Sequence, residues 1–67
     1  MVKERKEEII SNVKASYDYL IKNNNNPYEP ITMFDVVSYY TNNYDNLEII
    51  GGDWIRANIP ELKELPS

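Results

Sequence analysis

The first third of the chain carries a regular pattern of apolar and polar positions. At 3.6 residues per turn, one set of apolar side chains falls within a stripe roughly 120° wide: Val2, Ile9, Ile10, Val13, Tyr17, Leu20 and Ile21. Charged residues such as Glu4, Lys14 and Asp18 fall on the opposite side. The pattern predicts an amphipathic helix over Lys3–Lys22. Because exposing so large an apolar stripe to water is unfavourable, we expect a second element to cover it.

An asparagine run and two prolines follow this helix. Asparagine tolerates the left-handed conformation that often ends helices, and Pro27 disfavours helical geometry at the residue before it. Pro30 restricts Glu29 in the same way, so we expect a stiff extended connector over residues 27–30. We interpret the asparagine run as a tolerated loop of an asparagine-rich chain rather than as a binding loop.

A second helix is predicted over Met33–Asn43. Thr32 is a suitable N-cap, and Asp35 lies three residues later, near the positive end of the helix. The apolar positions of this segment share one helical face: Met33, Val36, Val37 and Tyr40, with Phe34 at its shoulder. On the same helical wheel, Asp35, Tyr39 and Asn42 point away from that face.

The last third allows two interpretations. In the first, Asp45 caps a short helical turn, and Asp53 caps a further helix that begins at Trp54. In the second, residues 47–57 form a β-hairpin around Gly51-Gly52, a dipeptide suited to a tight turn. We prefer the helical interpretation, because an isolated two-stranded hairpin is only marginally stable.

The C-terminal residues are expected to pack back onto the helices. Pro60 is acceptable in the first turn of a final helical piece. The apolar residues that would pack there are Ile59, Leu62 and Leu65, and Trp54 is expected to fill the core beside them. The chain is therefore predicted to be all-α: a small three-helix bundle forming a single domain over residues 1–67. The alternative is two helices plus a β-hairpin at 47–57.

The composition argues against catalysis. The chain has 67 residues with no histidine and no cysteine, so it lacks the side chains that most often perform chemistry near neutral pH. It contains no glycine-rich phosphate loop and no metal-binding motif, and carboxylates are the only strong metal ligands left. Carboxylate pairs such as Glu7/Glu8 and Glu61/Glu64 are expected on solvated faces. We predict no enzyme, no cofactor and no metal site.

The charge balance bears on partners and location. Eleven acidic and seven basic residues give a net charge of −4, which repels a phosphate backbone. A small dimeric helix-turn-helix DNA-binding transcriptional regulator stays as an alternative, with Asn46, Arg56 and Asn58 as base-reading candidates. The chain begins without the apolar region of a secretory signal and contains no run of about 20 apolar residues. We therefore expect a cytoplasmic protein that does not enter a membrane.

Tyrosine is the residue in excess. Two of the six tyrosines, Tyr17 and Tyr40, are predicted to face the core. Tyrosine is enriched in protein interfaces because it joins a large apolar ring to a polar group. The residues that we predict to contact a partner are Tyr19, Tyr28, Asp35, Tyr39, Asn42, Tyr44 and Arg56.

A few of these residues resemble those of the colicin-type nuclease immunity proteins. Asp35, the pair Tyr39-Tyr40, Trp54 and the sequence Arg56-Ala57-Asn58 carry the likeness. It covers only scattered residues of the second half, so we assign no family on it. The resemblance implies that an acidic surface with tyrosines suits an inhibitor of a basic, nucleic-acid-handling protein, where charge complementarity speeds association.

The favoured hypothesis is thus a non-enzymatic regulatory or inhibitory protein that binds another protein through an acidic, tyrosine-bearing surface. DNA binding by a helix-turn-helix is the first alternative. Self-association into a homo-oligomer through the same tyrosines is the second.

Overall fold

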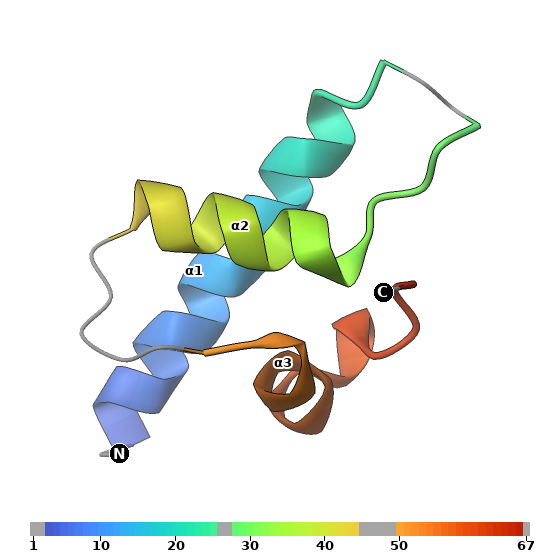
Figure 1. Cartoon of the computed structure of the whole chain (residues 1–67). Helices are drawn as coiled ribbons and strands as arrows, with labels where there is room; N and C mark the ends of the chain where they lie inside the picture. Colours follow the sequence, from blue (N-terminus) through green and yellow to red (C-terminus); the bar gives the residue numbers. More distant parts are fainter. Residues whose placement is uncertain (1–2, 26–27, 45–49, 67) are drawn as a thin grey trace.

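The computed structural model describes residues 3–25, 28–44 and 50–66, and every regular element among them is helical (Figure 1). The elements are α1 (Lys3–Lys22), α2 (Met33–Asn43), α3 (Gly52–Asn58) and a 3₁₀ turn, η1 (Pro60–Leu62). The all-α prediction is confirmed, and both long helices have the predicted bounds. The hairpin alternative is wrong, because residues 52–58 form a helix where it required a strand. The turn predicted after Asp45 lies outside the described residues.

The two long helices cross, and the C-terminal region fills the angle between them. Figure 1 shows α2 passing over the middle of α1, with α3 and the C-terminal turn beside α2. Each element sends apolar side chains into one shared core: Ile9, Val13, Met33, Val36, Tyr40, Ile50, Ile55, Ile59 and Leu62. The stripe of α1 is therefore covered as expected, by α2 and the C-terminal region together. None of the described helices is long and apolar enough to cross a bilayer.

The start of α2 confirms its predicted capping signal. Thr32 has extended backbone geometry, and its hydroxyl accepts a hydrogen bond from the Asp35 backbone N–H at 3.1 Å. The Asp35 carboxylate in turn accepts from the Thr32 backbone N–H at 3.1 Å. This reciprocal capping box satisfies two backbone donors that the helix itself leaves unpaired. Asp35 is thus a structural residue of α2, in addition to any role on the surface.

The end of α1 differs from the expected geometry. No described residue other than glycine has a positive φ, so the described asparagines do not adopt the left-handed conformation. Instead the Asn23 side-chain amide donates to the Tyr19 carbonyl at 2.9 Å, and the Asn23 backbone N–H donates to the same oxygen at 3.1 Å. The asparagine side chain therefore performs the capping that a left-handed residue would otherwise provide.

Helix α3 begins earlier than predicted. Asp53 was expected to be its N-cap, but it lies inside the first turn, and Gly51 occupies the cap position without a side-chain hydrogen bond. The reason is the close approach of Gly52 to α2. A Cβ atom on Gly52 would lie 2.9 Å from the Met33 Cγ atom, whereas one on Gly51 would meet nothing within 4 Å. Glycine at 52 thus allows α3 to begin against Met33.

We therefore expect Gly52→Ala to destabilise the fold and Gly51→Ala to leave it nearly unchanged. At position 52 the added methyl group must displace Met33, whose side chain is buried, at a cost of about 1 kcal/mol in the free energy of unfolding. At position 51 the extended backbone and open space accept alanine. Urea denaturation of both variants measures the difference. Equal stability of the two variants would show that Met33 yields without cost.

The buried surface of α1 departs from the predicted stripe at two positions. Ile21 was placed on the stripe but is 48% exposed, because the last turns of α1 extend beyond α2 (Figure 1). Ser16, a polar residue, is completely buried, and its hydroxyl donates to the Asn12 carbonyl at 2.9 Å. Tyr17 and Trp54 are half-buried at the edge of the core rather than enclosed by it.

Two contacts fasten the C-terminal residues. The Pro66 carbonyl accepts a hydrogen bond from the Met33 backbone N–H at 2.6 Å, at the beginning of α2. Lys14 on α1 forms an ion pair with Glu61 of η1, with Nζ and Oε2 2.7 Å apart. This ion pair lowers the pKa of the Glu61 carboxyl, chiefly through the hydrogen bond from Lys14. The C-terminal region is thus connected to both long helices.

Candidate functional site

The crossing of α1 and α2 brings two of the predicted partner-binding tyrosines together. The rings of Tyr19 and Tyr39 stack with centroids 4.8 Å apart and planes 24° from parallel. We call this pair the tyrosine seam. Tyr19 is 48% exposed and Tyr39 is half-buried, so the seam is both packed and accessible. Next to it, Tyr44 stacks on the buried Tyr40 at 5.6 Å.

The neighbouring rings change the titration of Tyr39. Partial desolvation raises the pKa of its phenol above the usual value, and the nearby Tyr19 and Tyr44 phenols raise it further, since their ionised forms would repel a Tyr39 phenolate. A raised pKa in the folded state means that the neutral phenol is favoured by folding. The contribution of the neutral Tyr39 phenol to the free energy of unfolding is present below about pH 10. It is lost as the pH rises through the folded-state pKa.

We therefore expect the fold to lose thermal stability in alkali more steeply in the wild type than in Tyr39→Phe. The variant keeps the stacked ring but removes the ionisable group. Tyr28→Phe removes a phenol outside the seam and serves as the control. Thermal unfolding followed by circular dichroism from neutral pH to above about pH 10 measures the effect. Parallel curves for wild type and Tyr39→Phe would contradict it.

The other predicted partner-binding residues are distributed over the molecule. Asn42 is exposed on α2, three positions from Tyr39 and seven from Asp35, so the three residues share one face of the helix. Tyr28 lies on the connector and is 91% exposed. Arg56 lies on α3, where its guanidinium donates to the Leu65 carbonyl at 3.4 Å. The structure thus gathers Tyr19, Tyr39 and Tyr44, with Asp35 and Asn42 along α2.

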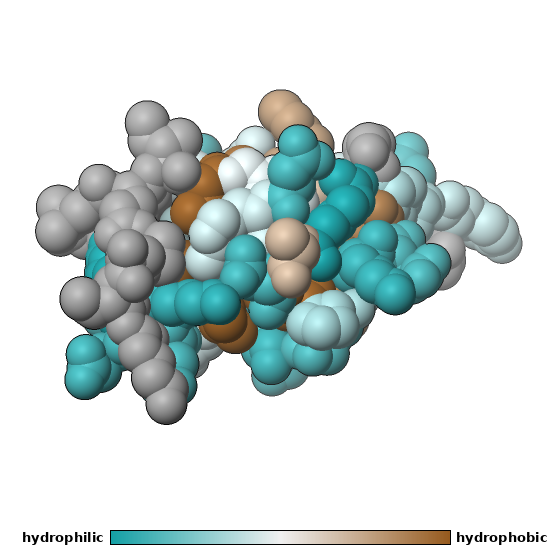
Figure 2. All heavy atoms as spheres, turned by 90° about the horizontal axis from the view of Figure 1, so that it is seen from below, coloured by the Kyte–Doolittle hydropathy of each residue, from teal (hydrophilic) through white to brown (hydrophobic). Residues whose placement is uncertain are grey.

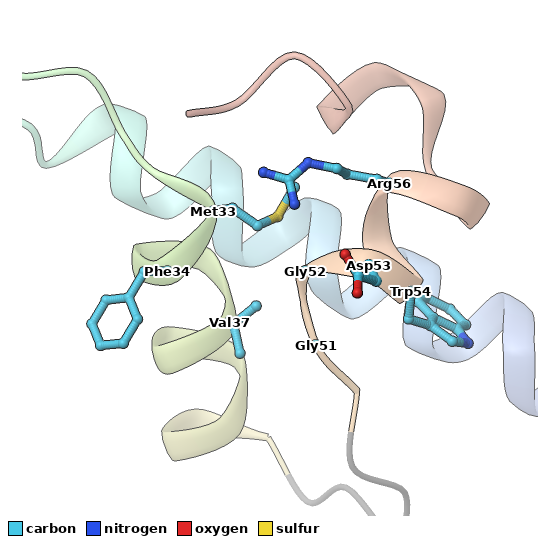
Figure 3. A pocket seen from close by; sticks show the side chains of 8 residues that line it. All are labelled: Met33, Phe34, Val37, Gly51, Gly52, Asp53, Trp54 and Arg56. Carbon is cyan, nitrogen blue, oxygen red and sulfur yellow. The ribbon is translucent and has the colours of Figure 1, made fainter. Parts of the chain in front are cut away.

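A second surface was not predicted from the sequence. An open groove of about 630 Å³ lies between the first turns of α2 and the beginning of α3 (Figure 3). We call it the α2–α3 groove. Its lining residues are Met33, Phe34, Val37, Gly51, Gly52, Asp53, Trp54 and Arg56. Neither residues 33–37 nor residues 51–56 form a recognisable motif in the sequence, and only the tertiary fold brings the two segments together.

The groove joins an apolar interior to polar edges. Figure 3 shows Met33 and Val37 directed toward the two glycines, while the Arg56 guanidinium reaches toward Met33 from α3. Phe34 points outward from the rim, and its side chain is 73% exposed. On the face seen in Figure 2, apolar surface forms separate areas between hydrophilic residues.

The described residues contain no cluster of three or more carboxylates that could hold a metal ion. Two basic side chains are already engaged, since Arg5 pairs with Glu8 at 2.9 Å and Lys14 pairs with Glu61. The site's chemistry consists of aromatic rings, amide groups and a few charges. Aromatic rings of this kind are enriched in protein interfaces.

No family model, no curated protein and no solved structure matches this chain. The residues that resemble the nuclease immunity proteins therefore stay an isolated likeness.

Proposed function

We propose that the chain is a non-enzymatic regulatory or inhibitory protein that binds another protein through the tyrosine seam and the adjoining face of α2. The observation that carries the proposal is the seam itself: two stacked rings, fixed by the crossing of two helices, with about half of Tyr19 open to solvent. Interfaces are enriched in tyrosine, and a few buried aromatics contribute most of the affinity.

The stacking reduces the entropic cost of binding. A free aromatic side chain loses rotamer freedom when a partner immobilises it, at a cost of about 0.5–1.5 kcal/mol. Tyr19 and Tyr39 already restrict each other, so part of this ordering is complete before the partner arrives. Asn42 then offers an exposed amide beside the rings for hydrogen bonding.

The net negative charge of the chain indicates the sign of the partner's charge. The net charge of −4 favours a basic protein surface and speeds its association at low salt. We expect the association rate to fall as ionic strength rises, since screening shortens the range of attraction. A basic, nucleic-acid-handling protein fits this description.

The test begins with capture of a partner by the immobilised chain from nuclease-treated lysate. The proposal expects one stoichiometric basic protein, and titration of the purified partner should show Tyr19→Ala and Tyr39→Ala weakening the affinity about tenfold or more. Phe34→Ala removes an exposed aromatic outside the seam and is the matched control. Asp35 is unsuitable as a binding variant, because its loss would also open the capping box.

Unchanged affinity in both tyrosine variants, with circular dichroism like the wild type, would place the binding surface elsewhere. Capture of no stoichiometric protein would contradict the proposal as a whole.

The DNA-binding alternative gains no support from these contacts. A recognition helix contacts base edges with residues near its N-terminus, but α3 has only seven residues and exposes Asp53 in its first turn. A carboxylate at that position repels the phosphate backbone. Retention of a DNA duplex at about 150 mM salt, with a steep salt dependence, would reverse this preference.

A further inference from the structure

The patch around the α2–α3 groove carries an exposed aromatic beside an apolar hollow. Phe34 is 73% exposed at the rim, while Met33 and Val37 contribute the apolar wall of the groove itself. A phenyl ring left in water forgoes about 1.5–3 kcal/mol of burial, and the apolar atoms on the surface of the open groove are likewise in contact with water. Both features become favourable if the ring of one molecule enters the groove of another.

The same patch carries one charge of each sign. Asp53 is exposed in the first turn of α3, and Arg56 follows one turn later on the same helix. The hydrogen bond from Arg56 to the Leu65 carbonyl holds its guanidinium at the edge of the groove (Figure 3). The two charges cancel within the patch, so the overall charge of −4 is not concentrated here.

We infer that this patch is a self-association surface whose occupant is a second copy of the chain. In a dimer with two-fold symmetry, the same patch serves both partners and must be complementary to itself. The patch around the α2–α3 groove meets that condition. It carries the protruding ring of Phe34 beside the groove, and it carries one acidic side chain, Asp53, and one basic side chain, Arg56. Phe34 of each molecule fills the groove of the other, and Asp53 of each molecule faces Arg56 of the other.

Two further observations favour a second copy over a different partner. A chain of 67 residues buries only about 60% of its unfolded surface on folding, less than a larger domain does, so an apolar contact between copies adds burial that the monomer lacks. A basic or acidic peptide would find only one complementary charge in the groove and one that repels it. The dimer is also compatible with partner binding, because Phe34 and Tyr39 lie about 140° apart around α2.

Sedimentation equilibrium of the purified full chain over roughly 10 µM to 1 mM tests the inference, a range suited to weak interfaces. The wild type should pass from monomer to dimer with rising concentration, and Phe34→Ala should weaken the dimer about tenfold or more. Tyr28→Ala is the matched control: it removes an even more exposed aromatic from outside the patch and should dimerise like the wild type.

A charge exchange tests the two-fold arrangement. Asp53→Arg alone places two bases opposite each other, and Arg56→Asp alone places two acids opposite each other, so each variant should remain monomeric. Mixed in equal amounts, the two variants restore both opposite-charge pairs and should form a heterodimer. Because an unfolded variant could not be rescued by mixing, recovery of the dimer separates a lost contact from a lost fold.

Three results would overturn the inference. A wild type that stays monomeric at the highest concentration would leave the groove to some other occupant. Loss of the dimer in Tyr28→Ala but not in Phe34→Ala would move self-association to the tyrosines. Failure of the mixed charge variants to associate would exclude the two-fold pairing of Asp53 with Arg56.

Discussion

Tyr40→Ala should leave the chain largely unfolded at 25 °C. The Tyr40 side chain is 1% exposed, lies in the core shared by all the helices and stacks on Tyr44. Replacing a buried aromatic by alanine costs about 3–5 kcal/mol, through lost transfer free energy and the cavity left behind. Domains of this size are rarely more stable than roughly 3–5 kcal/mol. The loss is therefore of the same size as the total.

Circular dichroism in increasing urea measures this loss, with two variants for comparison. Tyr40→Phe retains the ring and its stacking, so it should keep most of the wild-type stability. Tyr28→Ala removes the same atoms from a side chain that is 91% exposed, and we expect a change of no more than about 0.5 kcal/mol. A folded Tyr40→Ala variant with wild-type helicity would mean that the core collapses around the cavity without penalty.

The sequence was sufficient to predict the two long helices because each carries independent and consistent signals. In α1 the apolar period alone specifies the helix, and in α2 the period agrees with the capping residues Thr32 and Asp35. The segment after residue 50 carries weaker signals, because α3 has only seven residues and begins at glycine. Its helical state depends on tertiary contacts such as that of Gly52 with Met33.

Neither candidate surface could be derived from patterns along the chain. Tyr19 and Tyr39 each fall outside the apolar face of their own helix, and they meet only because the helices cross. The α2–α3 groove joins residues 33–37 to residues 51–56, and its volume depends on how closely α3 approaches α2. The periodicity of a single helix contains no information on how two helices cross or how closely they approach. The sequence therefore indicated which residues could contact a partner, but not which of them lie together on the surface.

Ser16 shows the same limit within the core and leads to the second large expected effect. A serine in a helical pattern reads as a surface residue, yet Ser16 is completely buried. The Ser16 hydroxyl donates a hydrogen bond to the Asn12 carbonyl of the same helix, so the hydroxyl needs no partner from another element. Ser16 also follows Val13 by three positions, which places its side chain on the buried side of α1. We infer that its small size is what the packing requires.

Ser16→Leu should therefore destabilise the fold by about 3 kcal/mol, the upper part of the range for overpacked cores. The longer branched side chain has no free volume at a fully enclosed position, and it would have to push α1 away from the elements that cover it. Ser16→Ala is the matched control. It removes a local hydrogen bond but improves helix propensity, so it should change the stability by no more than about 1 kcal/mol.

The pair of variants separates size from polarity at this position. If the hydroxyl were essential, Ser16→Ala would lose at least as much stability as Ser16→Leu in the same urea titration. If size decides, alanine is tolerated and leucine is not, because close packing penalises added volume even when the added atoms are apolar. The second outcome is the one that the enclosed position of Ser16 and its purely intrahelical hydrogen bond require.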